Sequence, residues 1–241
     1  MPARPLTVVG IDGAPGGWLL ARQEGLQRPT VRFLDGLDGV IGELIDGSID
    51  VVGIDIPVGL SSDGNRPADQ LARARLGPRR STFFPTPVRS VLDAESWEHA
   101  SAASRRAAGV GLSKQAWNLV PKIREVDRLW RRSIADSLVE VHPELSFAEM
   151  QGTPVMTKKS DPDGADQRRR LLAEHLTMPG LSGTHRRAFV DALVESMPRK
   201  LSIDTIDALA VLWSARRHAL GRSVTLGGER DPLGRPMAVT I

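Results

Sequence analysis

Apolar residues in this chain fall into short runs that end at acidic or turn-forming residues. Over the first 55 residues these runs are strand-like, and they predict strands at Leu6–Ile11, Trp18–Arg22, Thr30–Leu34 and Ile49–Ile54. Helical spacing between the last two runs predicts a helix at Leu37–Ile45. The glycine-rich turn at 13–17 joins the first two strands into a hairpin, and Pro57 prevents extension of the fourth strand.

Beyond residue 60 the spacing of apolar residues is mainly helical. It predicts helices at 66–77, 95–108, 113–135, 144–150, 166–176, 184–195 and 202–220. Residues 81–88 form a proline-rich loop, a fifth short strand is expected at Leu138–His142, and Met237–Ile241 is expected to form a small terminal strand. The last helix has Ser202 as its expected N-cap and Gly221 as its stop.

This order of elements predicts an α/β fold. Three meandering strands, a crossover helix and a parallel fourth strand give a mixed five-stranded sheet flanked by helices on both faces. We expect one domain over residues 1–241, with a helical insertion at 58–136 between strands four and five. The insertion follows the carboxyl end of a parallel strand, where sheets of this class bind ligands.

Two of the predicted strands end in an aspartate after the same four residues. Val-Val-Gly-Ile precedes both Asp12 and Asp55. If the two strands are parallel neighbours, both carboxylates emerge at one edge of the sheet, and their repulsion raises the pKa of one of them. A divalent cation removes that conflict, and oxygen ligands suit Mg²⁺ or Mn²⁺.

Three further acids are expected near the same edge. Asp204 and Asp207 lie three residues apart and share one stripe of the last helix, whose opposite stripe, Ile206, Leu209, Ala210 and Trp213, should face the sheet. Glu140 comes from the fifth strand and shares a face with His142. Carboxylates around two cations about 3.5–4 Å apart are the arrangement for attack of water on a phosphodiester.

Each of these residues also has a structural interpretation. Asp12-Gly13 is a common hairpin sequence, and Asp55 could simply close a strand. Asp204 is favoured in a first helical turn by the helix dipole, and Glu140 could pair with a nearby arginine. A histidine before proline, as His142 is, is more often hydrogen-bonded in the structure than a general base.

Composition excludes several classes of site and adds one hint. The chain has no cysteine, which excludes disulfides, zinc–thiolate sites and thiol nucleophiles. No run of 18 apolar residues and no signal-peptide pattern is present, so we expect a cytoplasmic protein with no membrane partner. The net charge is only +3, but 27 of the 32 basic residues are arginine, whose forked guanidinium matches phosphate oxygens.

The sequence resembles the bacterial family called domain of unknown function 429, described as predicted RNase H-like nucleases. The matching blocks cover most of the chain: Gly10–Asp12 with Gly17-Trp18, Gly53–Leu60, Arg66–Asp69 with Ala72-Arg73, Phe84–Arg89, Lys122–Asp127, Glu140–Glu144 and Asp204–Ala210. The resemblance implies an RNase H-like fold with Asp12, Asp55 and Asp207 as metal ligands, and Asp204 and Glu140 as added catalytic acids. One departure from simple RNase H is that the second ligand is placed on strand four, with Glu43 as the candidate acid of the crossover helix.

The resulting hypothesis is a metal-dependent nuclease that uses Mg²⁺ or Mn²⁺ and acts on DNA or RNA. The arginine-rich insertion would supply phosphate contacts through Arg66 and Arg89, and Gln115 would hydrogen-bond to the substrate. Two alternatives stay open: a nucleotide-binding ATPase or phosphotransferase of the actin and sugar-kinase type, and a non-catalytic module that binds nucleic acid. The sequence does not indicate an oligomeric state.

Overall fold

The central sheet of the protein has five strands in the order β3-β2-β1-β4-β5. The computed structural model describes residues 4–241. The strands are β1 (Thr7–Ala14), β2 (Gly17–Glu24), β3 (Thr30–Leu34), β4 (Val51–Ile54) and β5 (Leu138–Glu140). β1 is antiparallel to β2 and parallel to β4, and β5 is parallel to β4, so the sheet is mixed and its strand order is that of an RNase H-like fold.

The hairpin between β1 and β2 is tighter than the sequence predicted. Gly13 and Ala14 continue β1, and Ala14 pairs with Gly17, so only Pro15 and Gly16 form the turn. Gly16 has a φ of 81°, a left-handed conformation that glycine adopts without strain. Asp12 therefore lies within the strand and not at its end.

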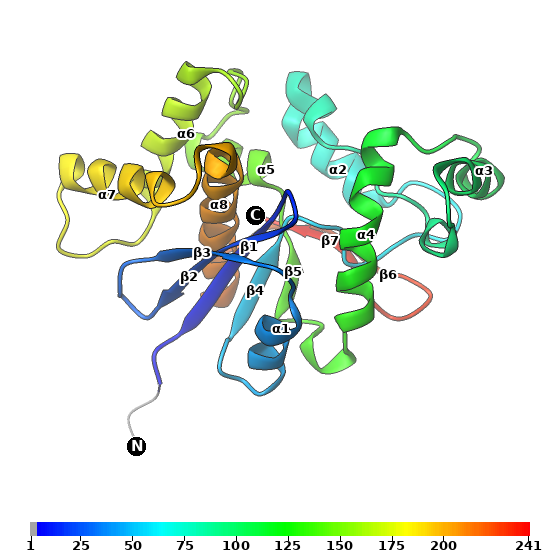
Figure 1. Cartoon of the computed structure of the whole chain (residues 1–241), viewed down its shortest axis with the longest axis horizontal. Coiled ribbons are helices and arrows are strands. Elements are labelled where there is room, and N and C mark those ends of the chain that lie inside the picture. Colours follow the sequence, from blue (N-terminus) through cyan, green and yellow to red (C-terminus); the bar gives the residue numbers. More distant parts are fainter. Residues whose placement is uncertain (1–3) are drawn as a thin grey trace.

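Helices cover both faces of this sheet (Figure 1). On one face, α1 (Asp38–Ile45) and α4 (Lys114–Leu129) bury Val40, Ile41, Ile123 and Val126 against Val9, Ile11 and Ile54. On the other face lies α8 (Ser202–Ala219), which is itself covered by α5 (Pro143–Gln151), α6 (Pro162–His175) and α7 (Gly183–Glu195). The predicted helix at 113–135 is shorter than expected, because it ends at Leu129 before the short 3₁₀ turn Arg132–Ile134.

α8 lies directly on the sheet because two glycines leave room for it. A Cβ at Gly10 would lie 2.1 Å from the backbone nitrogen of Leu212, and one at Gly53 would lie 3.0 Å from Val211. The stripe of α8 that faces the sheet therefore contains Ala208, Val211, Leu212 and Ala215. The prediction that Ile206, Leu209, Ala210 and Trp213 face the sheet is wrong, because α8 is buried on nearly every side and its apolar residues do not mark one face.

The segment between β4 and β5 is helical, as predicted. It contains α2 (Pro67–Leu76), the 3₁₀ helices Gly77–Thr82 and Arg89–Asp93, α3 (Trp97–Ala108) and α4. β1 and β4 run toward the end of the molecule where α8 begins and where α2 lies (Figure 1). None of the helices in the described part of the chain is both long and apolar enough to cross a membrane.

The C-terminal residues form a small second sheet. β6 (Thr225–Arg230) and β7 (Pro236–Thr240) are antiparallel, and Thr240 makes a single bridge to Val141 beside the edge strand β5. The sequence predicted only β7, because the glycines and charges of β6 give it no apolar alternation. The N-cap of α8 is Leu201 and not Ser202, which the sequence predicted for that position. Ser202 is instead the first residue of the helix.

Candidate functional site

Strand alternation directs Asp12 and Asp55 toward α8. Gly10 and Asp12 lie on the same face of the sheet because they are two residues apart, and so do Gly53 and Asp55. The two glycines let α8 approach the sheet. Each aspartate lies on the same face two residues after its glycine, toward the carboxyl end of the strand. Ile11 pairs with Ile54, and the Asp55 N–H donates to the Ile11 carbonyl at 2.9 Å, so the two acids are in register.

The other two aspartates come from the first turns of α8. The sheet-facing stripe of this helix, extended by one turn toward its N-terminus, reaches Asp204 and Asp207. Asp207 is buried, with 1% of its surface exposed, whereas Asp204 is half-buried. The structure therefore brings together the four aspartates that the sequence placed on three separate elements.

These aspartates are close enough to repel one another, and nearby positive charge offsets this repulsion only in part. Burial raises the pKa of Asp12 well above its usual range, and the charges of Asp55 and Asp207 raise it further. Burial and the charge of Asp207 raise the pKa of Asp55 to about 7, an effect partly offset by Lys159 and by a hydrogen bond with Asp12. Burial is also the main reason that the pKa of Asp204 is raised, followed by the charge of Asp207.

A cavity of about 250 Å³ opens over these acids. Its walls include Asp12, Asp55 and Asp204, with Phe84 and Leu119 from the helical segment on the other side. A second cavity of about 270 Å³ shares Asp55, Thr82, Phe84, His142 and Lys159 with the first and adds Arg79. The two cavities form one groove along the carboxyl ends of β1 and β4.

Lys159 lies in this groove and was not identified from the sequence. Its Nζ lies 2.6 Å from Asp207 Oδ2, and its charge acts on Asp12 and Asp55 as well. The one sequence signal that could have indicated it is the rarity of lysine, since only 5 of the 32 basic residues are lysines. A second lysine, Lys122, lies over the Trp18 ring at 4.2 Å and also interacts electrostatically with Asp12 and Asp204.

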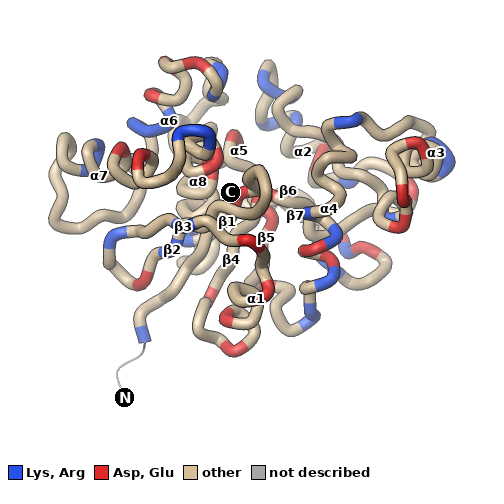
Figure 2. The backbone as a smooth tube through the Cα atoms, viewed as in Figure 1, with Lys and Arg blue, Asp and Glu red and all other residues tan. Residues whose placement is uncertain are grey.

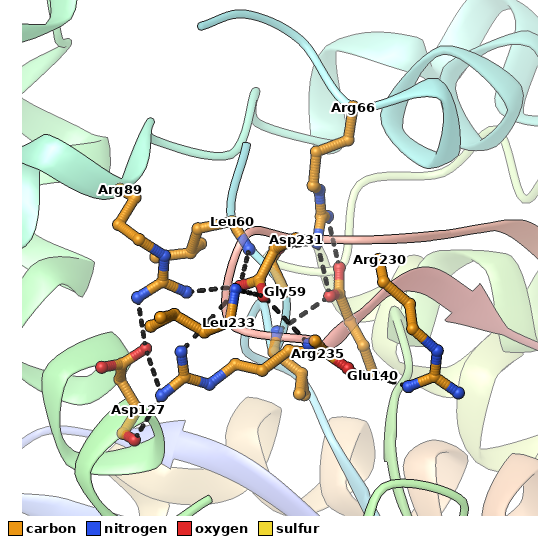
Figure 3. Close-up of polar contacts among 12 residues, drawn as sticks. Gly59, Leu60, Arg66, Arg89, Asp127, Glu140, Arg230, Asp231, Leu233 and Arg235 are labelled. Atoms are coloured by element: carbon orange, nitrogen blue, oxygen red, sulfur yellow. Dashed lines mark hydrogen bonds and ion pairs between the residues drawn. The ribbon is translucent and has the colours of Figure 1, made fainter. Parts of the chain in front are cut away.

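The structure ties Glu140 to Arg66 and leaves neither free for a ligand. Arg66 donates from Nη1 and Nη2 to the two carboxylate oxygens of Glu140, at 2.7 and 2.6 Å (Figure 3). Its Nε donates to Asp69 at 2.8 Å. The Val58 N–H also donates to Glu140 at 3.0 Å. The alternative in which Glu140 pairs with an arginine is confirmed, and the phosphate contact expected of Arg66 is not supported, because only 1% of Arg66 is exposed.

Arg89 is also used within the protein. It donates to Asp127 Oδ1 at 2.9 Å and to the buried Asp231 in the loop between β6 and β7 (Figure 3). Arg235 pairs with the same two acids, so this network fastens the C-terminal hairpin to the helical segment. Buried carboxylates require a cationic partner, and this requirement accounts for Arg66 and Arg89 better than contact with phosphate does.

Gln115 and His142 are the two remaining residues that the sequence singled out. Gln115 is exposed in the first turn of α4, one turn before the cavity residue Leu119. His142 stacks on Phe83 at 4.9 Å between ring centroids, and its Nε2 lies 3.3 Å from the Thr82 carbonyl. Burial and the charge of Lys159 lower the pKa of His142 to about 4, so its ring is neutral at neutral pH. These contacts agree with the structural interpretation of this histidine.

The donor set fits a magnesium-type ion that is held by few protein ligands. Within residues 4–241, no group of three or more His, Asp or Glu side chains is arranged to hold a metal ion. However, Mg²⁺ keeps several waters and is commonly bound through one or two carboxylates plus phosphate oxygens of a substrate. Asp12 and Asp55 provide such a pair, and Asp207 Oδ1 is buried with no hydrogen-bond partner.

Comparison with known proteins yields a family and no function. A family model described as "Protein of unknown function (DUF429)" matches residues 10–231. No curated protein and no solved structure matches the chain.

Proposed function

For this chain, which belongs to the DUF429 family of proteins of unknown function, we propose a divalent-metal-dependent nuclease that hydrolyses phosphodiester bonds of nucleic acid. The observation that carries the proposal is the packing of Asp12 and Asp55 with the two aspartates of α8 at one end of the groove. Burial and neighbouring carboxylates raise the pKa of Asp12, Asp55 and Asp204, and such repulsion between buried acids is typical of a functional site. A bound cation would relieve the repulsion between these carboxylates.

Asp12 and Asp55 are the residues that would hold the ion. Both reach the groove from adjacent parallel strands, whose backbone hydrogen bonds fix their spacing. A bound Mg²⁺ or Mn²⁺ would polarise a phosphoryl oxygen and lower the pKa of bound water. Asp204, half-buried beside them, would accept a proton from water, which its raised pKa favours at neutral pH.

The rest of the groove suits a single nucleic-acid strand. Phe84 lines both cavities with 44% of its surface exposed, which makes it a surface for stacking a base. Arg79 faces the second cavity and forms no ion pair with any residue in the described range, and its buried Nε has no partner. The α2 region around it carries several further basic residues (Figure 2). Arg79 therefore takes over the phosphate contact that the sequence assigned to Arg66 and Arg89.

The proposal is tested by incubating the purified protein with 5′-labelled single- and double-stranded DNA and RNA. We expect cleavage with Mg²⁺ or Mn²⁺, none with EDTA, and a loss of at least about 100-fold in Asp12→Asn, because removal of a group that only orients a metal ligand already costs about 10- to 100-fold. Asp136→Asn is the matched control, since Asp136 is exposed at the opposite end of the strands. Equal cleavage by Asp12→Asn and the wild type, or no cleavage of any substrate, would contradict the proposal.

A further inference from the structure

Lys159 bonds Asp207, one of the three acids that the family resemblance implies as metal ligands. Its ammonium is bonded to Asp207 Oδ2 at 2.6 Å, while the other oxygen of Asp207 is buried and has no partner. The side chain of Lys159 is 47% exposed, whereas that of Asp207 is only 2% exposed. The lysine thus reaches from the solvent side into the acid cluster and neutralises its deepest member.

The backbone of Lys159 is held in place by the elements on either side of it. A Cβ at Gly164 would lie 1.9 Å from the Lys158 carbonyl oxygen, so only glycine allows α6 to approach this loop so closely. Arg168 is fully buried, donates to the Thr157 carbonyl at 3.1 Å and pairs with Glu144 of α5 at 2.7 Å. Lys159 is therefore presented to the site by a fixed turn, unlike a lysine that only covers a surface.

The contact with Lys159 distinguishes Asp207 from Asp12 and Asp55. Asp12 and Asp55 are adjacent, and within the described residues no lysine or arginine side chain makes a hydrogen bond or ion pair with either of them. Asp207, by contrast, already has a cation. The ammonium bonded to Oδ2 repels a second cation that approaches Asp207 through its free Oδ1, so the tethered lysine competes strongly with any ion from solution for this carboxylate.

We propose that the protein holds one divalent cation, between Asp12 and Asp55, and that Lys159 supplies the second positive charge through Asp207. This inference rests on the proposed function and replaces the two ions predicted from the sequence. Lys159 acts as a positioning residue, because its ion pair holds the Asp207 carboxylate in place beside the ion. The chain uses lysine here although arginine is its usual basic residue.

The count of bound Mn²⁺ per chain tests this inference. The full chain is titrated with Mn²⁺ while the free ion is followed by electron paramagnetic resonance. We expect one ion in the wild type, one in Lys159→Arg, which keeps the charge, and two in Lys159→Gln, which frees Asp207. The matched control is Lys158→Gln, where the neighbouring lysine is exposed and forms no ion pair within residues 4–241, and one ion is expected.

Other outcomes would contradict either the role of Lys159 or the metal dependence of the proposed nuclease. Two ions in the wild type, or one ion with unchanged affinity in a folded Lys159→Gln, would overturn the role of Lys159 and leave the nuclease proposal standing. No bound ion in the wild type would overturn the metal-dependent proposal itself. If Lys159→Gln does not fold, as judged by its melting transition, the wild-type and Lys159→Arg counts decide, since two ions in either would contradict the inference.

Discussion

Glu140 accepts two hydrogen bonds from the guanidinium of Arg66, and both side chains are almost completely buried. This pair joins β5 to the loop that opens the helical segment, across 74 residues of sequence. Loss of one partner from a buried ion pair costs about 3–5 kcal/mol, because the other charge is left without compensation.

We therefore expect Arg66→Ala to lower the free energy of unfolding by about 3–5 kcal/mol, which urea denaturation measures. The matched control is Arg80→Ala, since Arg80 is exposed and forms no ion pair in the described part of the chain, and a change within about 0.5 kcal/mol is expected. A loss below about 1 kcal/mol for Arg66→Ala would show that this pair does not fasten the segment.

Packing of α8 against β1 sets the position of the aspartates. Gly10→Ala would place a Cβ 2.5 Å from the Ala208 carbonyl and even closer to the Leu212 nitrogen, so the helix must move away from the strand. We expect a loss of at least about 1–3 kcal/mol in urea denaturation, as for other overpacked cores, together with weaker Mn²⁺ binding. Gly42→Ala in α1, where nothing lies within 4 Å of the added Cβ, should be neutral or stabilising. Equal effects of the two substitutions would contradict the close approach.

The pKa of Asp55 predicts how stability depends on pH. Because burial and neighbouring charge raise this pKa from 3.8 to about 7, the folded protein holds a proton that the unfolded chain releases. The contribution of this group is fully present below pH 3.8 and is lost as the pH rises through about 7. In EDTA, Asp55→Asn should therefore become more stable relative to the wild type as the pH rises from 4 to 8, as measured by melting temperature.

Addition of Mn²⁺ should reverse this trend in the wild type, because the ion replaces the proton between the carboxylates and binds best when they are ionised. The melting temperature should rise with Mn²⁺ more at pH 8 than at pH 5, and Asp55→Asn should lose the response. A stability difference between the two proteins that does not vary with pH in EDTA would contradict the raised pKa.

Phe84 and Arg79 should contribute to binding of a single strand. Stacking on an aromatic side chain provides about 1–3 kcal/mol per base, so Phe84→Ala should weaken binding of single-stranded DNA by about 10-fold or more. Fluorescence anisotropy measures the affinity for single-stranded DNA, and all variants carry Asp12→Asn to prevent cleavage. Phe33→Ala is the aromatic control, because Phe33 is exposed on the edge strand β3. Arg79→Ala should weaken binding and reduce its salt dependence. If Phe84→Ala and Phe33→Ala have the same affinity, the groove is not the binding site.

The fold and the acid cluster could be predicted because both depend on local patterns. Gly-Ile-Asp in two strands that pair in parallel, combined with the two-residue alternation of a strand, is enough to place Asp12 and Asp55 together. The pairing of charges could not be predicted, because Arg89 meets Asp231 across 142 residues and Lys159 meets Asp207 across 48. Nothing in the local sequence distinguishes an arginine that lines a cavity, such as Arg79, from one that neutralises a buried acid, such as Arg66.

A crystal grown with Mn²⁺ would show whether these carboxylates hold an ion, because the anomalous difference map locates the metal. We expect one peak coordinated by carboxylate oxygens of Asp12 and Asp55, with the Lys159 ammonium still bonded to Asp207. An Mn²⁺-containing crystal with no peak at these carboxylates, and Asp12 and Asp55 bonded only to each other, would contradict it.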